Sequence, residues 1–190
     1  MERCLWLGRA RSSAIEIGAA EAPFDAYYAH CVHSVFRGGY RSARETAERF
    51  LREAEREARL TEIAAAHRIL GLILLWQGDF EEARAYFERV LITYDPERDR
   101  ETKFRFGQDS RVAATSYLAL AAWFFGDVRR GQELMGEACA RAVDSAYAPT
   151  LLNTYSLKAT LEMLVTTLKR PGARQKLLSR SVVSTVLRSI

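Results

Sequence analysis

The residue types best suited to chemistry meet at one place in this chain, the stretch His30-Cys31-Val32-His33. His30 and His33 are three positions apart, so on a helix they share one face, and Cys31 does not easily join them. A protein-bound zinc ion needs three or four such ligands, and His67 is the only other histidine in the chain. We therefore interpret these as ordinary helix residues and expect neither a metal ion nor a cofactor.

Other arrangements that support catalysis are missing from the sequence. No serine lies in a nucleophile-elbow pattern, and no G-x4-G-K-[ST] phosphate loop occurs. Acidic residues are numerous, but they lie beside Arg and Lys on amphipathic stretches, which is typical of solvated helix faces. We therefore predict no catalytic residue, and we expect that the chain is not an enzyme.

The distribution of charge argues against nucleic acid as a partner. The 190 residues include 28 Lys and Arg against 24 Asp and Glu, a net charge of +4. Six of the basic residues follow the last acidic residue, Glu162, which leaves 22 basic against 24 acidic residues up to position 168. The excess of positive charge thus belongs to the end of the chain, whereas a nucleic-acid-binding domain carries it on its folded body.

The apolar runs and the cysteines predict a cytoplasmic protein that does not enter a membrane. The longest uncharged apolar runs, residues 70–76 and 117–126, fall short of the roughly 18–20 residues that a membrane span needs. The first residues contain no apolar stretch long enough for a signal peptide. The three cysteines are odd in number and form no CxxC pair, which favours reduced thiols.

Three short turns that contain glycine divide the chain, with periods of 40 and 48 residues. After each turn, small and apolar residues recur at offsets 0, 4, 7, 8 and 11, which draws one stripe down an α-helix and fits no strand. The turns are Gly38-Gly39-Tyr40, Gly78-Asp79-Phe80 and Gly126-Asp127-Val128. The stripes that follow them are Ala43, Ala47, Phe50, Leu51, Ala54; Ala83, Phe87, Val90, Leu91, Tyr94; and Gly131, Met135, Ala138, Cys139, Ala142.

This repetition predicts an all-α fold, an α-solenoid of antiparallel helix pairs with about three pairs and a partial fourth. We expect a leader or extra helix over residues 1–22, the repeat domain over 23–168, and a basic tail or incomplete repeat over 169–190. The connection over residues 95–111 is about eight residues longer than the first one. Its mixed charges favour a solvated loop or a helix extension, and the functional alternative is a polar contact beside a groove. The repeat units span about 24–60, 61–98, 110–146 and 148–168.

The second unit, over residues 67–87, resembles a tetratricopeptide repeat (TPR). The resemblance rests on the Leu70-Gly71 pair, the turn that begins at Gly78, and Ala83-x3-Phe87. Gly71 and Ala83 let two helices approach closely, Gly78 permits the tight turn, and Phe87 fills space against the next repeat. The first and third units keep only small or apolar substitutes at these positions.

A closer resemblance covers roughly residues 27–165. Residues 91–98, 106–109 and 117–126 are similar to the repeat regions of large bacterial signalling proteins, which carry an adenylate/guanylate cyclase domain and an AAA-type ATPase domain. This chain has no phosphate loop and no α/β domain that would hold a cyclase metal site. The resemblance therefore implies the interaction or sensing end of a bacterial signalling system.

In TPR arrays the helix before each turn lines a concave groove. When those groove-facing positions are transferred to this chain, they form an apolar wall with one positive charge. Such a wall suits a hydrophobic helix or strand, which Arg68 would orient. We see no Lys/Arg/Asn clamp for a carboxylate among these positions. The predicted groove residues are Tyr28, Val32, Val35, Phe36, Arg68, Leu72, Leu75, Trp76, Ser116, Leu120, Trp123 and Phe124.

Two functions are consistent with such a wall. The first is a protein–protein interaction or scaffold module that holds a segment of a protein partner or of a neighbouring domain. The alternative is a regulatory receptor that senses a small apolar ligand and controls an associated nucleotide cyclase or ATPase. The same aromatic residues could instead belong to the core, or pack against a second copy, and a solenoid end without a polar cap favours a homodimer.

Overall fold

The computed structural model describes residues 22–168 of the chain. The predicted leader over residues 1–22 and the tail over 169–190 lie outside this part, apart from position 22. Between residues 22 and 168 the regular structure is entirely helical, which confirms the all-α prediction. The helices are α2 (Ala22–Phe36), α3 (Tyr40–Arg56), α4 (Leu60–Gln77), α5 (Phe80–Thr93), α6 (Thr102–Arg105), α7 (Ser110–Phe124), α8 (Val128–Ser145) and α9 (Ala148–Leu168).

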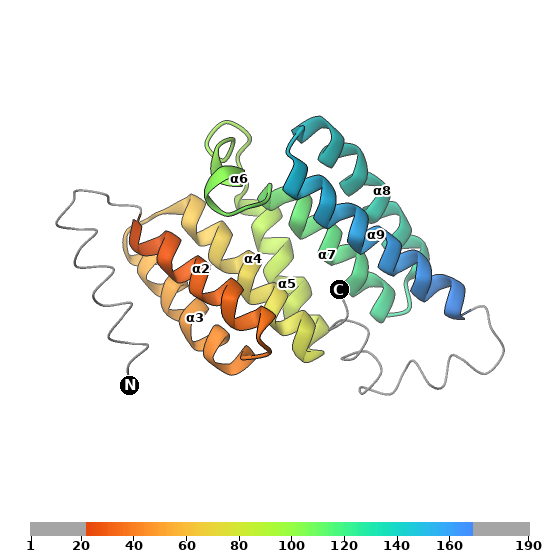
Figure 1. Cartoon of the computed structure of the whole chain (residues 1–190), viewed down its shortest axis with the longest axis horizontal. Helices are drawn as coiled ribbons and strands as arrows, with labels where there is room; N and C mark the ends of the chain where they lie inside the picture. The colour runs from red at the N-terminus through yellow and green to blue at the C-terminus, as the bar shows by residue number, and fades with distance from the viewer. Residues whose placement is uncertain (1–21, 169–190) are drawn as a thin grey trace.

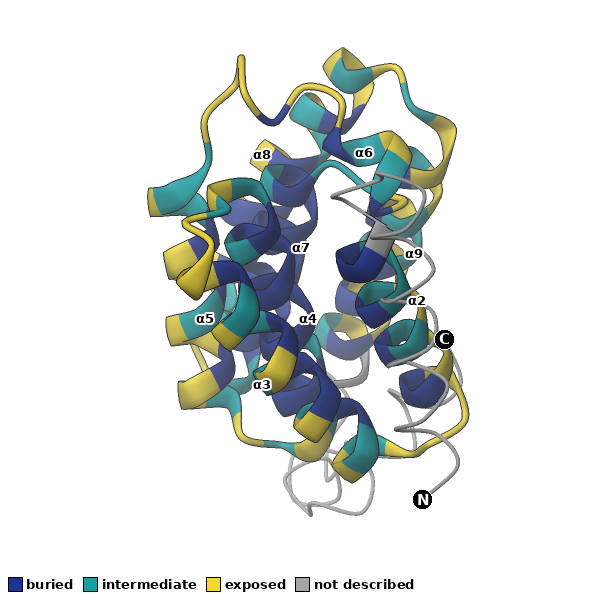
Figure 2. Ribbon diagram, turned by 90° about the vertical axis from the view of Figure 1, so that its left-hand side faces the viewer, coloured by how far each residue is buried: buried dark blue, intermediate teal, exposed yellow. Residues whose placement is uncertain are grey.

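The helices form a row of antiparallel pairs, α2 with α3, α4 with α5, and α7 with α8, followed by α9 (Figure 1). Neighbouring pairs are joined where α3 packs on α4, α5 on α7, and α8 on α9. Figure 2 shows α3, α5 and α8 along one side of α4 and α7, with α2 and α9 on the other side. The solenoid-like arrangement is therefore present, and α4 and α7 lie at its centre because they have neighbours on both sides.

The three glycine turns close their helices in the same way. Gly38, Gly78 and Gly126 adopt the left-handed conformation, with φ of 72°, 86° and 87°. The amide after each glycine donates back across the turn, as in Asp79 N to Leu74 O at 3.0 Å. This is the Schellman arrangement, which satisfies carbonyls that a helix end otherwise leaves unpaired. The predicted tight turns are confirmed.

A fourth turn has the same geometry without a glycine. Ala58, after α3, has φ of 52°, and the Arg59 amide donates to Ala54 O at 2.9 Å. A residue with a Cβ in this conformation costs roughly 1–2 kcal/mol. The residue type does not predict this turn, because alanine ordinarily continues a helix.

The small residues of the stripes let helices approach closely. A Cβ added at Gly71 would lie 2.7 Å from the Phe87 ring, and one at Gly131 would lie 2.8 Å from Ala119 O. Phe87 is fully buried and stacks on Tyr117 of the next pair, with ring centroids 5.4 Å apart. The packing roles predicted for Gly71 and Phe87 are confirmed.

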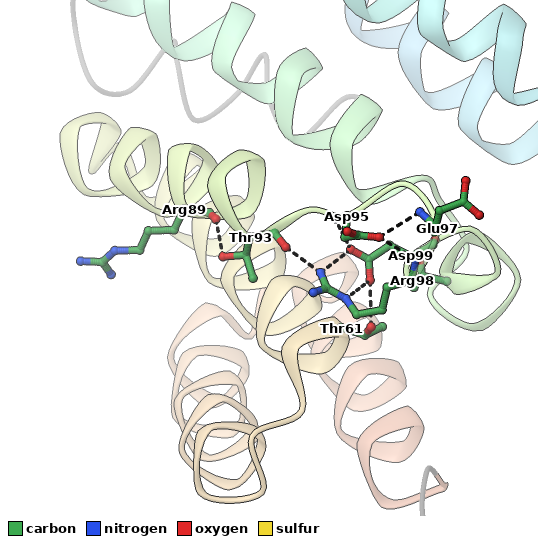
Figure 3. A network of polar contacts seen from close by, with 8 residues as sticks. Thr61, Arg89, Thr93, Asp95, Glu97, Arg98 and Asp99 are labelled. Atoms are coloured by element: carbon green, nitrogen blue, oxygen red, sulfur yellow. Dashed lines mark hydrogen bonds and ion pairs between the residues drawn. The ribbon is translucent and has the colours of Figure 1, made fainter.

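The long connection between α5 and α7 is only partly the solvated loop that its charges favour. Asp99, Thr102 and Phe106 are all buried. The Asp99 carboxylate accepts hydrogen bonds from Thr61 of α4 at 2.8 Å, from Arg98 at 2.6 and 3.0 Å, and from the Asp95 amide at 2.9 Å (Figure 3). A charge with this many donors does not need water. The solvated-loop interpretation therefore fails for Asp99, whereas Asp95, Glu97, Arg100 and Glu101 are exposed as it expects.

Ion pairs hold the same connection against the first two inner helices. Arg105 of α6 contacts Asp25 of α2 at 2.8 Å and Glu62 of α4 at 3.1 Å. Glu62 is buried and also contacts Arg59 at 2.7 Å. Burial alone would raise the pKa of Glu62, but the hydrogen bonds from Arg59 and Arg105 leave it lowered. The connection thus has a fixed position beside α2 and α4.

Candidate partner-binding groove

One groove of about 580 Å³ lies between the inner helices. Its walls come from α2, the turn after it, the start of α3, α4, α7 and α9, so segments from both ends of the row meet around it. This volume falls within the roughly 300–1,000 Å³ that small-molecule sites occupy. The lining residues are Val35, Phe36, Arg37, Gly38, Tyr40, Leu72, Trp76, Tyr117, Asn153 and Leu157.

Four of the predicted groove residues line it, namely Val35, Phe36, Leu72 and Trp76. Phe36 ends α2 and its side chain is 83% exposed. Trp76 is half-buried, and its indole Nε1 is buried without a hydrogen-bond partner in the described part of the chain. The four residues form an apolar wall of the groove, and the ring of Phe36 is exposed to solvent.

The predicted residues on α7 and one on α4 have other surroundings. Leu75, Ser116 and Leu120 are almost completely buried and belong to the core. The Ser116 hydroxyl donates to Val112 O at 2.9 Å, within its own helix. Helices α4 and α7 have neighbours on several sides, so these three positions present no surface to a partner.

Three further predicted residues support the packing of neighbouring helices. Trp123 is buried, and Phe124 stacks on Phe80 of the preceding pair with ring centroids 4.2 Å apart. Val32 is half-buried against the cluster that surrounds Cys31. For these positions the core interpretation, which the sequence left open, describes the packing.

The remaining two predicted residues, Tyr28 and Arg68, meet in a polar cluster. Arg68 is 4% exposed, and its guanidinium donates to Tyr28 Oη at 2.8 Å, to Phe106 O at 2.9 Å and to Gln108 Oε1 at 3.3 Å. Asn153 Nδ2 of α9 donates to the same Gln108 oxygen at 3.4 Å. The cluster thus connects α2, α4, the connection before α7, and α9.

Sequence reasoning missed the contribution of α9. Asn153 and Leu157 line the groove, and they continue the spacing of four seen in Tyr28 with Val32 and in Arg68 with Leu72. The groove positions were carried over for three units only, although residues 148–168 were recognised as a partial fourth. Applying the same spacing to that unit would have identified both residues.

Two buried titratable side chains lie close to this region. Burial, with a smaller effect of Arg89, lowers the pKa of His67 to about 4. Burial raises the pKa of the Cys31 thiol to about 12, and the thiol donates to Ala43 O at 3.6 Å. A neutral imidazole and a protonated thiol at neutral pH fit a structural role inside the helix packing.

Within residues 22–168 no group of three or more His, Cys, Asp or Glu side chains is arranged to hold a metal ion. No helix of this part is long and apolar enough to cross a membrane. Comparison with known proteins finds no matching family model, no matching curated protein and no matching solved structure.

Proposed function

We propose that this chain is a TPR-like interaction module that holds an apolar segment of a protein partner, or of a neighbouring domain, in the groove between α2, α4, α7 and α9. The observation that carries the proposal is Phe36, a large apolar side chain that is 83% exposed at the wall of an otherwise apolar groove. Exposed apolar surface beside a concavity is typical of interaction sites. The resemblance to repeat regions of bacterial cyclase proteins supports a place in a signalling system.

The test compares proteins captured from a bacterial extract by the wild type and by variants. We expect the double variant Phe36→Ala with Trp76→Ala to lose a specific partner while far-UV circular dichroism stays near wild type. Phe36→Ala alone should weaken capture without unfolding, because its side chain packs against little. The matched control is Ile92→Ala on α5, whose side chain is 84% exposed away from the groove lining. Equal loss of the partner in the Ile92 variant, or full capture by the double variant, would refute the proposal.

The geometry also favours a second candidate, a regulatory receptor for a small ligand that acts on an associated cyclase or ATPase. The specific observation is the bridge at one end of the groove, where Gln108 accepts hydrogen bonds from both Arg68 and Asn153. A segment that continues in both directions would meet this bridge, whereas a small ligand can end there. The two candidates differ in whether the purified protein binds a small amphipathic probe or an apolar peptide.

A second copy of the chain remains a further proposed partner. On α9, Leu152 is 72% exposed and Tyr155 is 47% exposed. Sedimentation of the full chain over a range of concentrations tests this, with Leu152→Glu as the variant that should keep the protein monomeric. A mass that stays monomeric at all concentrations in the wild type would exclude the dimer.

A further inference from the structure

The charge of Arg68 is not balanced by a carboxylate. Its three acceptors, the Tyr28 hydroxyl, the Phe106 carbonyl and the Gln108 amide oxygen, are all neutral, and no ion pair joins it to an acidic side chain within residues 22–168. Its Nε is buried without any partner among those residues. Burying an arginine without a negative partner is costly, because the charge gives up its hydration and gains little in return.

Hydrogen-bond donors outnumber acceptors around this charge. Arg68 and Asn153 both donate to the single oxygen Gln108 Oε1, and both bonds are long, at 3.3 and 3.4 Å. The Tyr28 hydroxyl accepts from Arg68, which leaves its own proton to be donated. A second acceptor, preferably charged, would satisfy donors that now share one weak acceptor.

One of these donors, Asn153, lines the apolar groove, and Arg68 is joined to it through Gln108. Asn153 and Tyr117 are both groove-lining residues. Burial raises the pKa of Tyr117, and the nearby positive charge of Arg68 opposes that rise. Tyr117 is therefore a neutral donor at neutral pH and lies within the electrostatic reach of Arg68. The groove leads from the exposed Phe36 to this cluster.

We propose that the groove binds a small amphipathic carboxylate, with its apolar chain along Leu72, Trp76 and Leu157 and its carboxylate among Arg68, Asn153 and Tyr28. The carboxylate replaces the Gln108 amide oxygen as the shared acceptor, so the guanidinium gains the negative partner that it lacks. The assignment rests on the proposed groove and deepens the receptor candidate. It differs from the sequence-based expectation of a groove without a carboxylate clamp, because Asn153 lay outside the three units compared.

The test is titration calorimetry of the full chain with decanoate, kept below the concentration at which it forms micelles, beside decanol as the uncharged analogue. We expect decanoate to bind about tenfold more tightly than decanol, since hydrogen bonds to a charged group are worth more than neutral ones. Asn153→Leu should remove most of this preference. Arg68→Met should remove all of it, and the Asn153 variant keeps the test valid if that substitution prevents folding.

The matched control is Arg37→Gln, which removes an exposed positive charge that also lines the groove, beside Phe36. This variant should retain the preference for decanoate. Equal binding of decanoate and decanol would overturn the carboxylate site while leaving the apolar groove in place. If Arg37→Gln instead abolished the preference, the carboxylate would bind near Phe36 and not near Arg68, and the proposed site would be wrong. Binding of an apolar peptide but of neither probe would overturn the ligand class and support the partner-segment function.

Discussion

The contact between α7 and α8 gives the sharpest test of the fold, because α8 contains two glycines in different surroundings. A Cβ at Gly131 would lie 2.8 Å from the backbone oxygen of Ala119, whereas one at Gly136 would have nothing within 4 Å. Ordinary contact begins at 3.4 Å, so Gly131→Ala must push the two helices apart by about 0.6 Å. Backbone atoms of two packed helices cannot yield as a flexible side chain does.

Both substitutions gain about 1 kcal/mol from helix propensity and from the lower entropy of the unfolded chain. For Gly136→Ala this is the whole effect, so its free energy of unfolding should rise by about 1 kcal/mol. For Gly131→Ala, overpacking costs roughly 1–3 kcal/mol, which leaves the variant less stable by up to about 2 kcal/mol. The difference between the two variants cancels the shared propensity and isolates the cost of the clash.

Urea unfolding followed by far-UV circular dichroism measures both free energies, and an unchanged dependence on urea concentration confirms that the same surface is exposed. Gly136→Ala should raise the free energy of unfolding, and Gly131→Ala should lower it. If Gly131→Ala stabilises the protein as much as Gly136→Ala does, α7 and α8 do not approach as closely as the structure places them.

Three other perturbations test separate features. Gly78→Val should lower the free energy of unfolding by more than 1 kcal/mol, because a β-branched residue is strained at φ of 86°. An unchanged urea midpoint would contradict the tight turn. Ala58→Gly should raise stability by about 1 kcal/mol, since glycine has no penalty at φ of 52°, and a loss in the same assay would show that Ala58 is not left-handed. Between pH 6.5 and about 4 the unfolded state protonates His67 while the folded state does not, so stability falls as pH falls, by up to about 1.4 kcal/mol per pH unit. His67→Gln should flatten this dependence of stability on pH, whereas His33→Gln, at an exposed position, should not. Equal slopes in both variants would argue against a buried neutral imidazole.

The local features of the fold could be predicted because each depends on residues close in sequence. The stripe from Ala83 to Phe87 sets one face of α5, and Gly78 sets the turn before it. The left-handed conformation of Ala58 was not predicted, because alanine ordinarily continues a helix. Asp99 was assigned to solvent from its charge, yet it is buried, and one of the donors to its carboxylate is Thr61, 38 positions earlier. A partner at that separation leaves no trace in local composition.

In the candidate site, too, some residues could be predicted from the sequence and others depend on tertiary packing. Phe36 and Trp76 were found by carrying over the groove positions of TPR arrays, and both line the groove. Leu120 has the same spacing but is buried, because α7 lies between neighbouring helices while α2 lies at the end of the row. Spacing identifies which face of a helix is apolar, and only the neighbours decide whether that face is covered.

The longer second period, of 48 residues, also explains why the polar cluster exists at all. A regular connection would carry the chain directly from α5 to the next pair, as it does from α3 to α4. The extra residues instead bring Phe106 against Tyr28, with ring centroids 5.0 Å apart, and place Gln108 between Arg68 and Asn153. The ion pairs of Arg105 hold them there. The insertion that interrupts the repeat thus connects Arg68 to the groove residue Asn153 through Gln108. Shortening it should therefore remove the proposed preference for a carboxylate before it removes the helical row.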